Sequence, residues 1–164
     1  MKTVAVREIH MCKKLVLVRH GDAEARGPQG DISRRLTKDG LTRLKAAYPA
    51  AFAQIKGEDD LVLWSSPATR ALETAGVVAD SLGLSRDDIE EHQCLYEQDS
   101  LAFRDELDEA TANTVVAVGH VPFMARMASA LTGEEQSFPK GTVLALDVSN
   151  VESEPAKVLW SVVP

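Results

Sequence analysis

The stretch LVLVRHGD, residues 15–22, decides the fold class of this chain. Four consecutive apolar residues are followed directly by an arginine, a histidine, a glycine and an aspartate. Two later stretches repeat this arrangement: residues 61–64 (LVLW) are followed by Ser65-Ser66-Pro67, and residues 115–118 (VVAV) by Gly119-His120. Short uninterrupted runs rich in valine and leucine are typical of parallel strands that are buried on both faces.

Helical patterns alternate with these strands. Four segments have them: residues 37–56, 67–82, 100–110 and 122–131. Ser66 before Pro67 predicts an N-cap followed by proline at the first helical position. Two more strands are predicted in the tail, at 142–148 and 158–163. The alternation predicts an α/β fold, a three-layer α/β/α sandwich around a mostly parallel sheet.

Length and composition predict one domain over residues 1–164. A chain of this size buries roughly two-thirds of the surface that it exposes when unfolded. Two interpretations of residues 1–11 stay open. Either Thr3–Val6 form an extra edge strand, or Met11 is an alternative start and the segment is a dispensable extension.

Charge and hydropathy exclude several classes of protein. The net charge of −7 argues against a nucleic-acid binder, which carries a basic stripe. No apolar run approaches the roughly 20 residues that span a membrane, and residues 1–10 lack the apolar core of a secretion signal. We therefore expect a cytoplasmic protein without membrane partners, with Cys12 and Cys94 reduced. The sequence leaves the oligomeric state open.

The predicted strand ends carry the chemistry. In open α/β sheets ligands bind beyond the carboxyl ends of the strands, so Arg19, His20, Arg70 and His120 are expected to face one crevice. Two arginines and a protonated histidine would counter the charge of a phosphoryl group. A neutral His20 would attack phosphorus covalently if a backbone carbonyl near Gly21 held its other nitrogen.

Arg70 has two interpretations. It lies in the first turn of its predicted helix, where the positive end of the helix dipole disfavours a cation. A bound phosphate would resolve this conflict, because helix N-termini and arginine both attract phosphate. The alternative is a surface arginine that pairs with Glu73 or Glu106.

Four motifs together resemble the histidine phosphatase superfamily, which includes the phosphoglycerate mutases. They are residues 19–21 (RHG), 36–40 (LTKDG), 66–75 (SPATRALETA) and 119–120 (GH). Their order and spacing agree with the family over about residues 13–148. The compact length and residues 119–122 (GHVP) are most similar to SixA-type phosphohistidine phosphatases.

The resemblance implies a hydrolase that needs no metal or other cofactor. It implies that His20 is phosphorylated during turnover and that Arg19, Arg70 and His120 complete the phosphate pocket together with Gly21. The partner would be a phosphorylated protein carrying phosphohistidine. No His-Glu-x-x-His or cysteine-rich motif indicates zinc. The remaining histidines, His10 and His92, lie in polar stretches and are expected on the surface.

The proton donor is the open part of the mechanism. An alkoxide leaving group is very basic and needs a general acid, whereas imidazole, with a pKa of about 6.5, leaves with little help. Members that hydrolyse phosphoesters place an acid before the strand of the second histidine, where this chain has Glu97. Asp22 is the second candidate. The alternative interpretation of each is an ordinary surface, turn or capping acid.

Two other functions remain open. One is a phosphomonoesterase for a small phosphorylated metabolite, in which Glu97 would matter strongly. The other is a non-catalytic module that binds a phosphorylated ligand, which has no need of a nucleophile such as His20. Arg34 and Arg35 are expected either to rim the pocket or to lie on a solvated loop.

Overall fold

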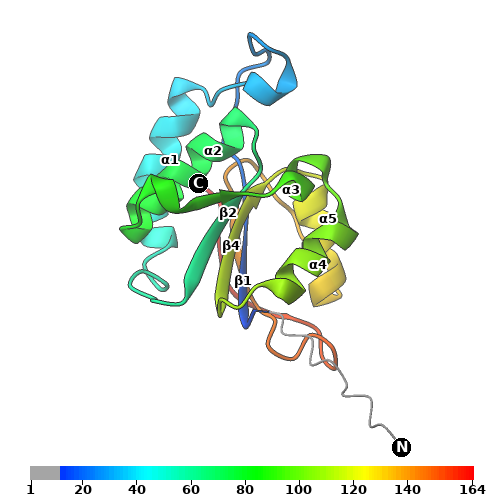
Figure 1. The fold of residues 1–164 in the computed structure, drawn as a ribbon. Helices are drawn as coiled ribbons and strands as arrows, with labels where there is room; N and C mark the ends of the chain where they lie inside the picture. The colour runs from blue at the N-terminus through cyan, green and yellow to red at the C-terminus, as the bar shows by residue number, and fades with distance from the viewer. Residues whose placement is uncertain (1–11) are drawn as a thin grey trace, which may run out of the picture.

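The structure, a computed structural model, describes residues 12–164 (Figure 1). The two interpretations of residues 1–11, and His10 with its expected surface role, lie outside this range. Within the described range, no helix has the length and apolar character needed to cross a membrane.

Residues 12–164 form one six-stranded sheet with the strand order β3-β2-β4-β1-β5-β6. The strands are β1 Lys14–Arg19, β2 Leu61–Ser65, β3 Ile89–Glu91, β4 Thr114–Gly119, β5 Val143–Asp147 and β6 Lys157–Val162. The first four run parallel to one another. β5 is antiparallel to β1, and β6 is antiparallel to β5. The prediction of a mostly parallel sheet is confirmed.

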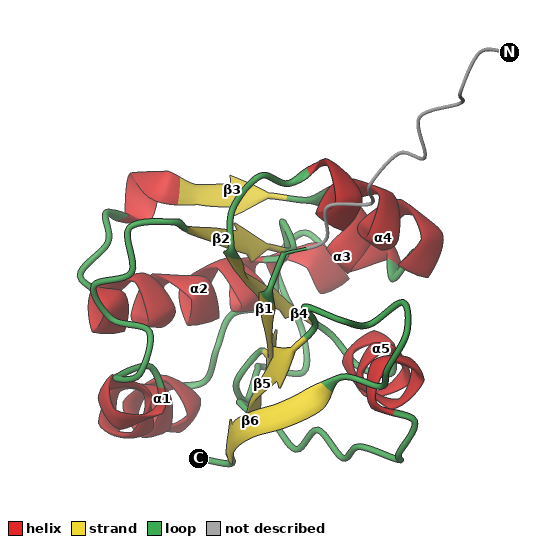
Figure 2. Cartoon of the chain, turned by 90° about the horizontal axis from the view of Figure 1, so that it is seen from below, coloured by secondary structure: helices red, strands yellow, loops and turns green. Residues whose placement is uncertain are grey.

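Helices cover both faces of this sheet. They are α1 Lys38–Ala51, α2 Thr69–Leu82, α3 Gln93–Glu97, α4 Ser100–Glu109 and α5 Phe123–Thr132. Figure 2 shows α1 and α2 on one side of the column of strands and α3, α4 and α5 on the other. The predicted three-layer α/β/α arrangement is therefore confirmed.

The alternation of side chains along β1 explains why its sequence is apolar throughout. Leu15 and Leu17 belong to the core cluster that contains Phe103 of α4 and Met124 of α5. Residues 16 and 18 belong to the other cluster, on the side of α1 and α2. Because both faces of a central strand are covered by helices, both sets of alternating residues must be apolar.

Several predicted boundaries were wrong by a few residues. The second helix begins at Thr69, with Ala68 as its N-cap. Ser66 is not the cap, although its Oγ accepts a hydrogen bond from the Ala68 amide at 3.2 Å. The first helix ends at residue 51 instead of about 56, and the chain continues there as turns.

Two short elements were not predicted. β3 has three residues and ends in two glutamates, and α3 has five residues. Neither is long enough to show a periodic pattern of apolar residues.

The LTKDG motif joins the first helix to the loop after β1. Thr37 caps α1 through its Oγ, which accepts a hydrogen bond from the Gly40 amide at 2.9 Å. The same hydroxyl donates to Asp22 at 3.1 Å. A Cβ at residue 40 would lie 2.6 Å from the Asp22 carbonyl oxygen, so only glycine allows this approach.

Tyr48 supports the loop behind the first histidine. Its side chain is fully buried in α1, and its hydroxyl donates to the Gly141 carbonyl at 2.9 Å. The Gly141 amide in turn donates to the His20 carbonyl at 3.0 Å. The core of the α1 layer is therefore connected to the end of β1 by two successive hydrogen bonds.

Tyr48→Phe is expected to lower the free energy of unfolding by about 1–2 kcal/mol, because it leaves the buried Gly141 carbonyl without a donor. Urea denaturation followed by circular dichroism measures this loss. The control is Tyr96→Phe, whose hydroxyl contact is solvent-exposed and whose loss should cost less than about 0.5 kcal/mol. Equal effects of the two variants would show that the Tyr48 hydroxyl does not stabilise the fold.

Candidate active site

Three strands end at one place and deliver the polar residues that follow them. His20 follows β1, Ser66 follows β2 and His120 follows β4. The ladder continues past the strand ends, since the His20 amide donates to the Gly119 carbonyl at 3.0 Å and the Ser66 amide donates to the Val118 carbonyl at 2.9 Å. The expected crevice at the carboxyl ends of the strands is therefore present.

This crevice contains a pocket of about 520 Å³. It is lined by Arg19, His20, Ala23, Asp31, Arg34, Arg70, Tyr96, Gln98, His120, Val121 and Lys140. Four of the predicted site residues, Arg19, His20, Arg70 and His120, are brought together in it. The imidazole rings of the two histidines lie 5.2 Å apart, centroid to centroid.

His20 is held as the sequence predicted, through its own neighbour. Its Nδ1 lies 2.7 Å from the Gly21 carbonyl oxygen, which can only accept a hydrogen bond. The Nε of Arg70 donates to the His20 Nε2 at 3.4 Å. Since an arginine can only donate, Nδ1 carries the proton and Nε2 is bare.

Burial keeps His20 in this neutral form. Desolvation of the charged ring lowers the pKa of His20 to about 4; the Gly21 carbonyl opposes this shift, and Arg70 and Arg19 add to it. At neutral pH the ring therefore presents an unprotonated Nε2 to the pocket.

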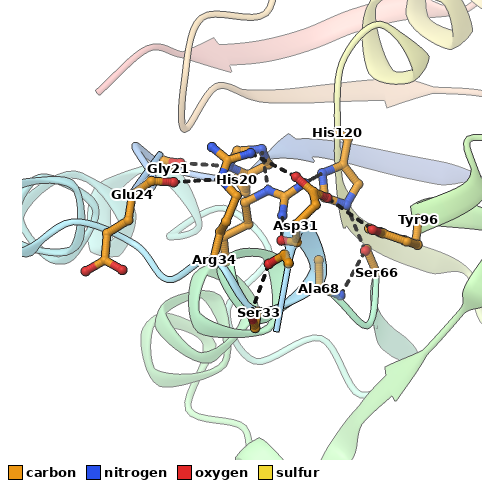
Figure 3. A network of polar contacts seen from close by, with 12 residues as sticks. His20, Gly21, Glu24, Asp31, Ser33, Arg34, Ser66, Ala68, Tyr96 and His120 are labelled. Carbon is orange, nitrogen blue, oxygen red and sulfur yellow. Dashed lines mark hydrogen bonds and ion pairs between the residues drawn. The ribbon is translucent and has the colours of Figure 1, made fainter. Parts of the chain in front are cut away.

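His120 is fixed by the same guanidinium. Its Nδ1 lies 3.3 Å from Arg70 NH2, and its Nε2 lies 2.8 Å from Ser66 Oγ (Figure 3). Nδ1 is therefore the acceptor and Nε2 donates to the serine. Burial, then the proximity of His20 and Arg70, lowers the pKa of His120 to about 3. Without a bound anion, burial and the nearby cation therefore disfavour a charged His120; the protonated form expected beside a phosphoryl group stays a prediction.

Arg70 is buried, with 6% of its surface exposed, and is not the surface arginine of the alternative interpretation. Neither expected acid pairs with it: Glu73 accepts from the Leu36 amide, and Glu106 pairs with His92. Its partner is Asp31, whose carbonyl accepts from NH1 at 2.8 Å and whose carboxylate accepts from NH2 at 3.1 Å.

Thr74 explains why the second-arginine motif extends one turn along α2. Its hydroxyl donates to the Arg70 carbonyl at 2.8 Å, and its oxygen accepts from the Gly21 amide at 3.2 Å. Gly21, whose carbonyl orients His20, is thereby fixed to the helix that carries Arg70. A Cβ on Gly21 would lie 2.9 Å from the side chain of Leu44, so the packing of α1 favours glycine there.

Arg19 lies at the end of β1 and donates from NH1 to the Phe138 carbonyl at 2.8 Å. Its Nε is buried and has no hydrogen-bond partner among the described residues. Burial lowers its pKa, but an arginine remains protonated under all ordinary conditions. A buried donor without an acceptor is unusual in a native structure, and a bound anion would supply the missing acceptor.

Asp31 was not predicted. It lies in a short 3-10 helix, Asp31–Ser33, in the loop between β1 and α1. Its partial burial raises the pKa, but hydrogen bonds from Arg34, Tyr96 and Arg70 outweigh that effect and lower the pKa to about 2. Figure 3 shows Asp31 between the two histidines and Tyr96. No local pattern marks this residue, because Arg70 and Tyr96, which connect it to the rest of the pocket, lie 39 and 65 positions away.

The two candidate proton donors do not line the pocket. Glu97 lies on α3 and faces an adjacent hollow with Phe123 and Arg126, and its carboxylate accepts from Gln93. Asp22 pairs with Lys140 at 2.6 Å, and this contact lowers the pKa of its carboxyl. The interpretation of Asp22 as a turn or capping acid fits its bonds to Thr37 and Lys140.

Arg34 and Arg35 were expected either to rim the pocket or to lie on a solvated loop, and each of them does one of the two. Arg34 lines the pocket, donating from Nε to the Glu24 carbonyl at 2.6 Å and from NH1 to Asp31 at 3.0 Å. Arg35 is exposed and pairs with Glu73. With Lys140, the pocket lining contains four cations and one carboxylate, although the chain as a whole is acidic. Such a local field attracts anions.

Comparison with known proteins supports the motif resemblance. The model of the histidine phosphatase superfamily (branch 1) matches residues 15–101. No curated protein sequence matches the chain.

Solved structures share the fold at low sequence identity. SixA from Agrobacterium tumefaciens is 22% identical and has a TM-score of 0.76, over 94% of this chain and 100% of that one. A protein histidine phosphatase SixA complexed with tungstate is 23% identical with a TM-score of 0.73, over 90% and 95% of the two chains. A mycobacterial glucosyl-3-phosphoglycerate phosphatase is 17% identical with a TM-score of 0.63, over 90% and 97%.

The family model covers more than half of the chain, and the matched residues include three of the four motifs, those at 19–21, 36–40 and 66–75. The chain belongs to the histidine phosphatase superfamily, as its four motifs predicted.

Proposed function

We propose that this protein is a metal-independent phosphatase that removes phosphate from phosphohistidine on a protein, with His20 as the nucleophile. The observation that carries the proposal is the bare Nε2 of His20, which burial keeps neutral, the Gly21 carbonyl orients, and the fold directs into a pocket lined by arginines. A pocket that only bound phosphate would have no use for a neutral imidazole between two cations. Phosphoryl transfer asks the protein mainly for such positioning and charge stabilisation.

The first step transfers the phosphoryl group to the protein. The lone pair of His20 Nε2 forms a bond to phosphorus, and the bond between phosphorus and the substrate imidazole breaks. The other ring nitrogen of the substrate histidine carries a proton, so the imidazole leaves as a neutral group that keeps the electron pair and needs no further proton. His20 retains its Nδ1 proton, and the Gly21 carbonyl stabilises the positive charge that the ring acquires.

Charge stabilisation comes from the residues around His20. Arg70 and Arg19 present guanidinium donors to the phosphoryl oxygens. His120 is neutral in the unliganded pocket, and a bound dianion raises its pKa, so that it gains a proton when phosphate arrives. In the second step a water molecule attacks phosphorus, the bond to Nε2 breaks, and phosphate leaves.

The choice of leaving group depends on whether a protonated acid lines the pocket. Among the described residues, Asp31 is the only carboxyl that lines the pocket, and its low pKa leaves it ionised and unable to donate a proton at neutral pH. An alkoxide needs a strong proton donor, whereas an imidazole with a pKa of about 6.5 does not. This arrangement favours phosphohistidine over a phosphoester.

Similar structures include representatives of both substrate classes. Two are SixA proteins, one named a protein histidine phosphatase and complexed with the oxyanion tungstate. A third is a phosphatase of glucosyl-3-phosphoglycerate. A phosphomonoesterase for a small metabolite is therefore the second candidate, and it requires an acid such as Glu97 to reach the leaving oxygen.

Purified protein is expected to release phosphate from a phosphohistidine-carrying protein in the presence of EDTA. His20→Ala should abolish release, because it removes the nitrogen that attacks phosphorus in the proposed mechanism. Glu97→Gln should change the rate less than about twofold, because the carboxylate does not line the pocket. Phosphate release is measured with phosphohistidine protein and with a panel of phosphoester metabolites.

Two results of this experiment would contradict the proposal. Release from phosphoesters alone, slowed strongly by Glu97→Gln, would assign the protein as a phosphomonoesterase. No release from any substrate, with phosphate still bound, would indicate a binding module.

Asp31→Asn is expected to tighten the binding of orthovanadate, an analogue of phosphate in transfer, by about fivefold. The Asp31 carboxylate accepts the hydrogen bond of Arg70 NH2 that the anion would otherwise receive, and its negative charge repels an incoming anion. Because the Asp31 side of this ion pair is half exposed, the pair is worth about 1 kcal/mol, which is a factor of about five in Kd. Competition against phosphate release gives the vanadate Kd. Weaker binding in the variant would show that Asp31 orients Arg70 for the ligand instead of competing with it.

A further inference from the structure

A second cluster of chemically active side chains lies outside the pocket. His92 at the start of α3, Cys94 within α3 and Glu106 on α4 place one nitrogen, one sulfur and one carboxylate oxygen within 4.8 Å of one another. None of the three lines the pocket around His20. The cluster joins two helices that lie side by side (Figure 1).

The cluster is held in place by packing. The His92 ring stacks on Trp64 with centroids 4.0 Å apart, and Trp64 meets Phe103 of α4 edge-on. Cys94 is 4% exposed. His92 was expected to lie on the surface, but its side chain is only 18% exposed because it packs against the tryptophan.

Without a metal, one carboxylate oxygen of Glu106 accepts hydrogen bonds from both His92 and Cys94. Glu106 Oε2 lies 2.8 Å from His92 Nδ1 and 2.9 Å from Cys94 Sγ. Tetrahedral zinc binds nitrogen and oxygen at about 2.0–2.2 Å and sulfur at about 2.3 Å. Its ligand atoms are therefore roughly 3.3–3.7 Å apart. The two contacts of Glu106 Oε2 would have to lengthen by roughly 0.5–0.8 Å to admit the ion.

We propose that His92, Cys94 and Glu106 bind a zinc ion that links α3 to α4. A thiolate and a carboxylate balance the two charges of the ion, so that the half-buried site is neutral. The sulfur ligand favours zinc over magnesium or calcium, which prefer oxygen. Because Glu106 and His92 are partly exposed, water takes the fourth position.

Proton balance is part of the binding reaction. Zinc binds cysteine as the thiolate, so the Cys94 thiol must lose its proton. Zinc displaces that proton to solvent as the metal–sulfur bond forms. His92 ligates through Nδ1, with its ring proton on Nε2. Zinc binding should therefore strengthen as the pH rises.

The site would act on the structure and not on the chemistry at His20. Tyr96 lies two residues after Cys94 on the same short helix, and its hydroxyl donates to Asp31 in the pocket wall. Zinc would fix α3, and with it this side of the pocket, against α4. The proposal does not depend on the phosphatase activity, and it is compatible with activity in EDTA.

The experiment starts from full-length protein stripped with EDTA and dialysed. Cobalt replaces zinc as a spectroscopic probe, because a thiolate ligand gives a charge-transfer band and tetrahedral geometry gives intense visible bands. We expect one equivalent of cobalt to produce both signals and zinc to displace it. Equilibrium dialysis with zinc alone gives the stoichiometry and the Kd.

Matched variants identify the site. Cys94→Ser should remove the thiolate band and weaken zinc binding by more than about 100-fold, beyond the loss typical of a residue that only supports a ligand. Two variants serve as controls: Cys12→Ser replaces the other buried cysteine, and His20→Ala replaces a histidine of the pocket. Both should leave the band and the Kd unchanged.

Glu106→Gln tests the site even if Cys94→Ser fails to fold, because it removes a different ligand and keeps the thiol. It should retain the thiolate band but bind zinc at least tenfold more weakly. Circular dichroism confirms the fold of each variant. Absence of any thiolate band in folded wild-type protein, or zinc binding that survives Cys94→Ser and is lost in His20→Ala, would overturn the proposal.

Discussion

One guanidinium determines the state of the pocket. Arg70 contacts the bare nitrogens of both His20 and His120, and an arginine has donors but no acceptor. Each imidazole must therefore turn an unprotonated nitrogen toward it and donate from its other nitrogen, His20 to the Gly21 carbonyl and His120 to the Ser66 hydroxyl. The nucleophilic form of His20 follows from this arrangement of donors and acceptors.

Much of this arrangement was predictable because the reason for it is local. A strand buried on both faces has to be apolar throughout, so the runs 15–18, 61–64 and 115–118 stand out in the sequence. Parallel strands end on one edge of the sheet, and this rule alone brings Arg19, His20 and His120 together. Arg70 follows from the same rule, because its helix begins just after the second strand.

The rest depends on contacts between distant parts of the chain. Asp31 is significant only because Arg70 and Tyr96 reach it from other elements, and its own loop carries no periodic pattern. The short elements β3 and α3 bring Tyr96 to the pocket and join His92 to Cys94. Each is too short to show the periodic pattern of apolar residues from which a strand or helix is predicted. Glu97 shows the converse: its place in the sequence suits a proton donor, yet its helix turns it away from the pocket lining.

The central claim is that His20 carries the phosphoryl group on the nitrogen that faces Arg70. Rapid acid-free quenching during turnover, followed by mass spectrometry and NMR of the labelled histidine, tests it most directly. The account predicts a phosphoryl group on Nε2 of His20, labile in acid and released by water. A phosphoryl group on His120, on Nδ1 of His20, or on no residue of a turning-over enzyme would contradict it.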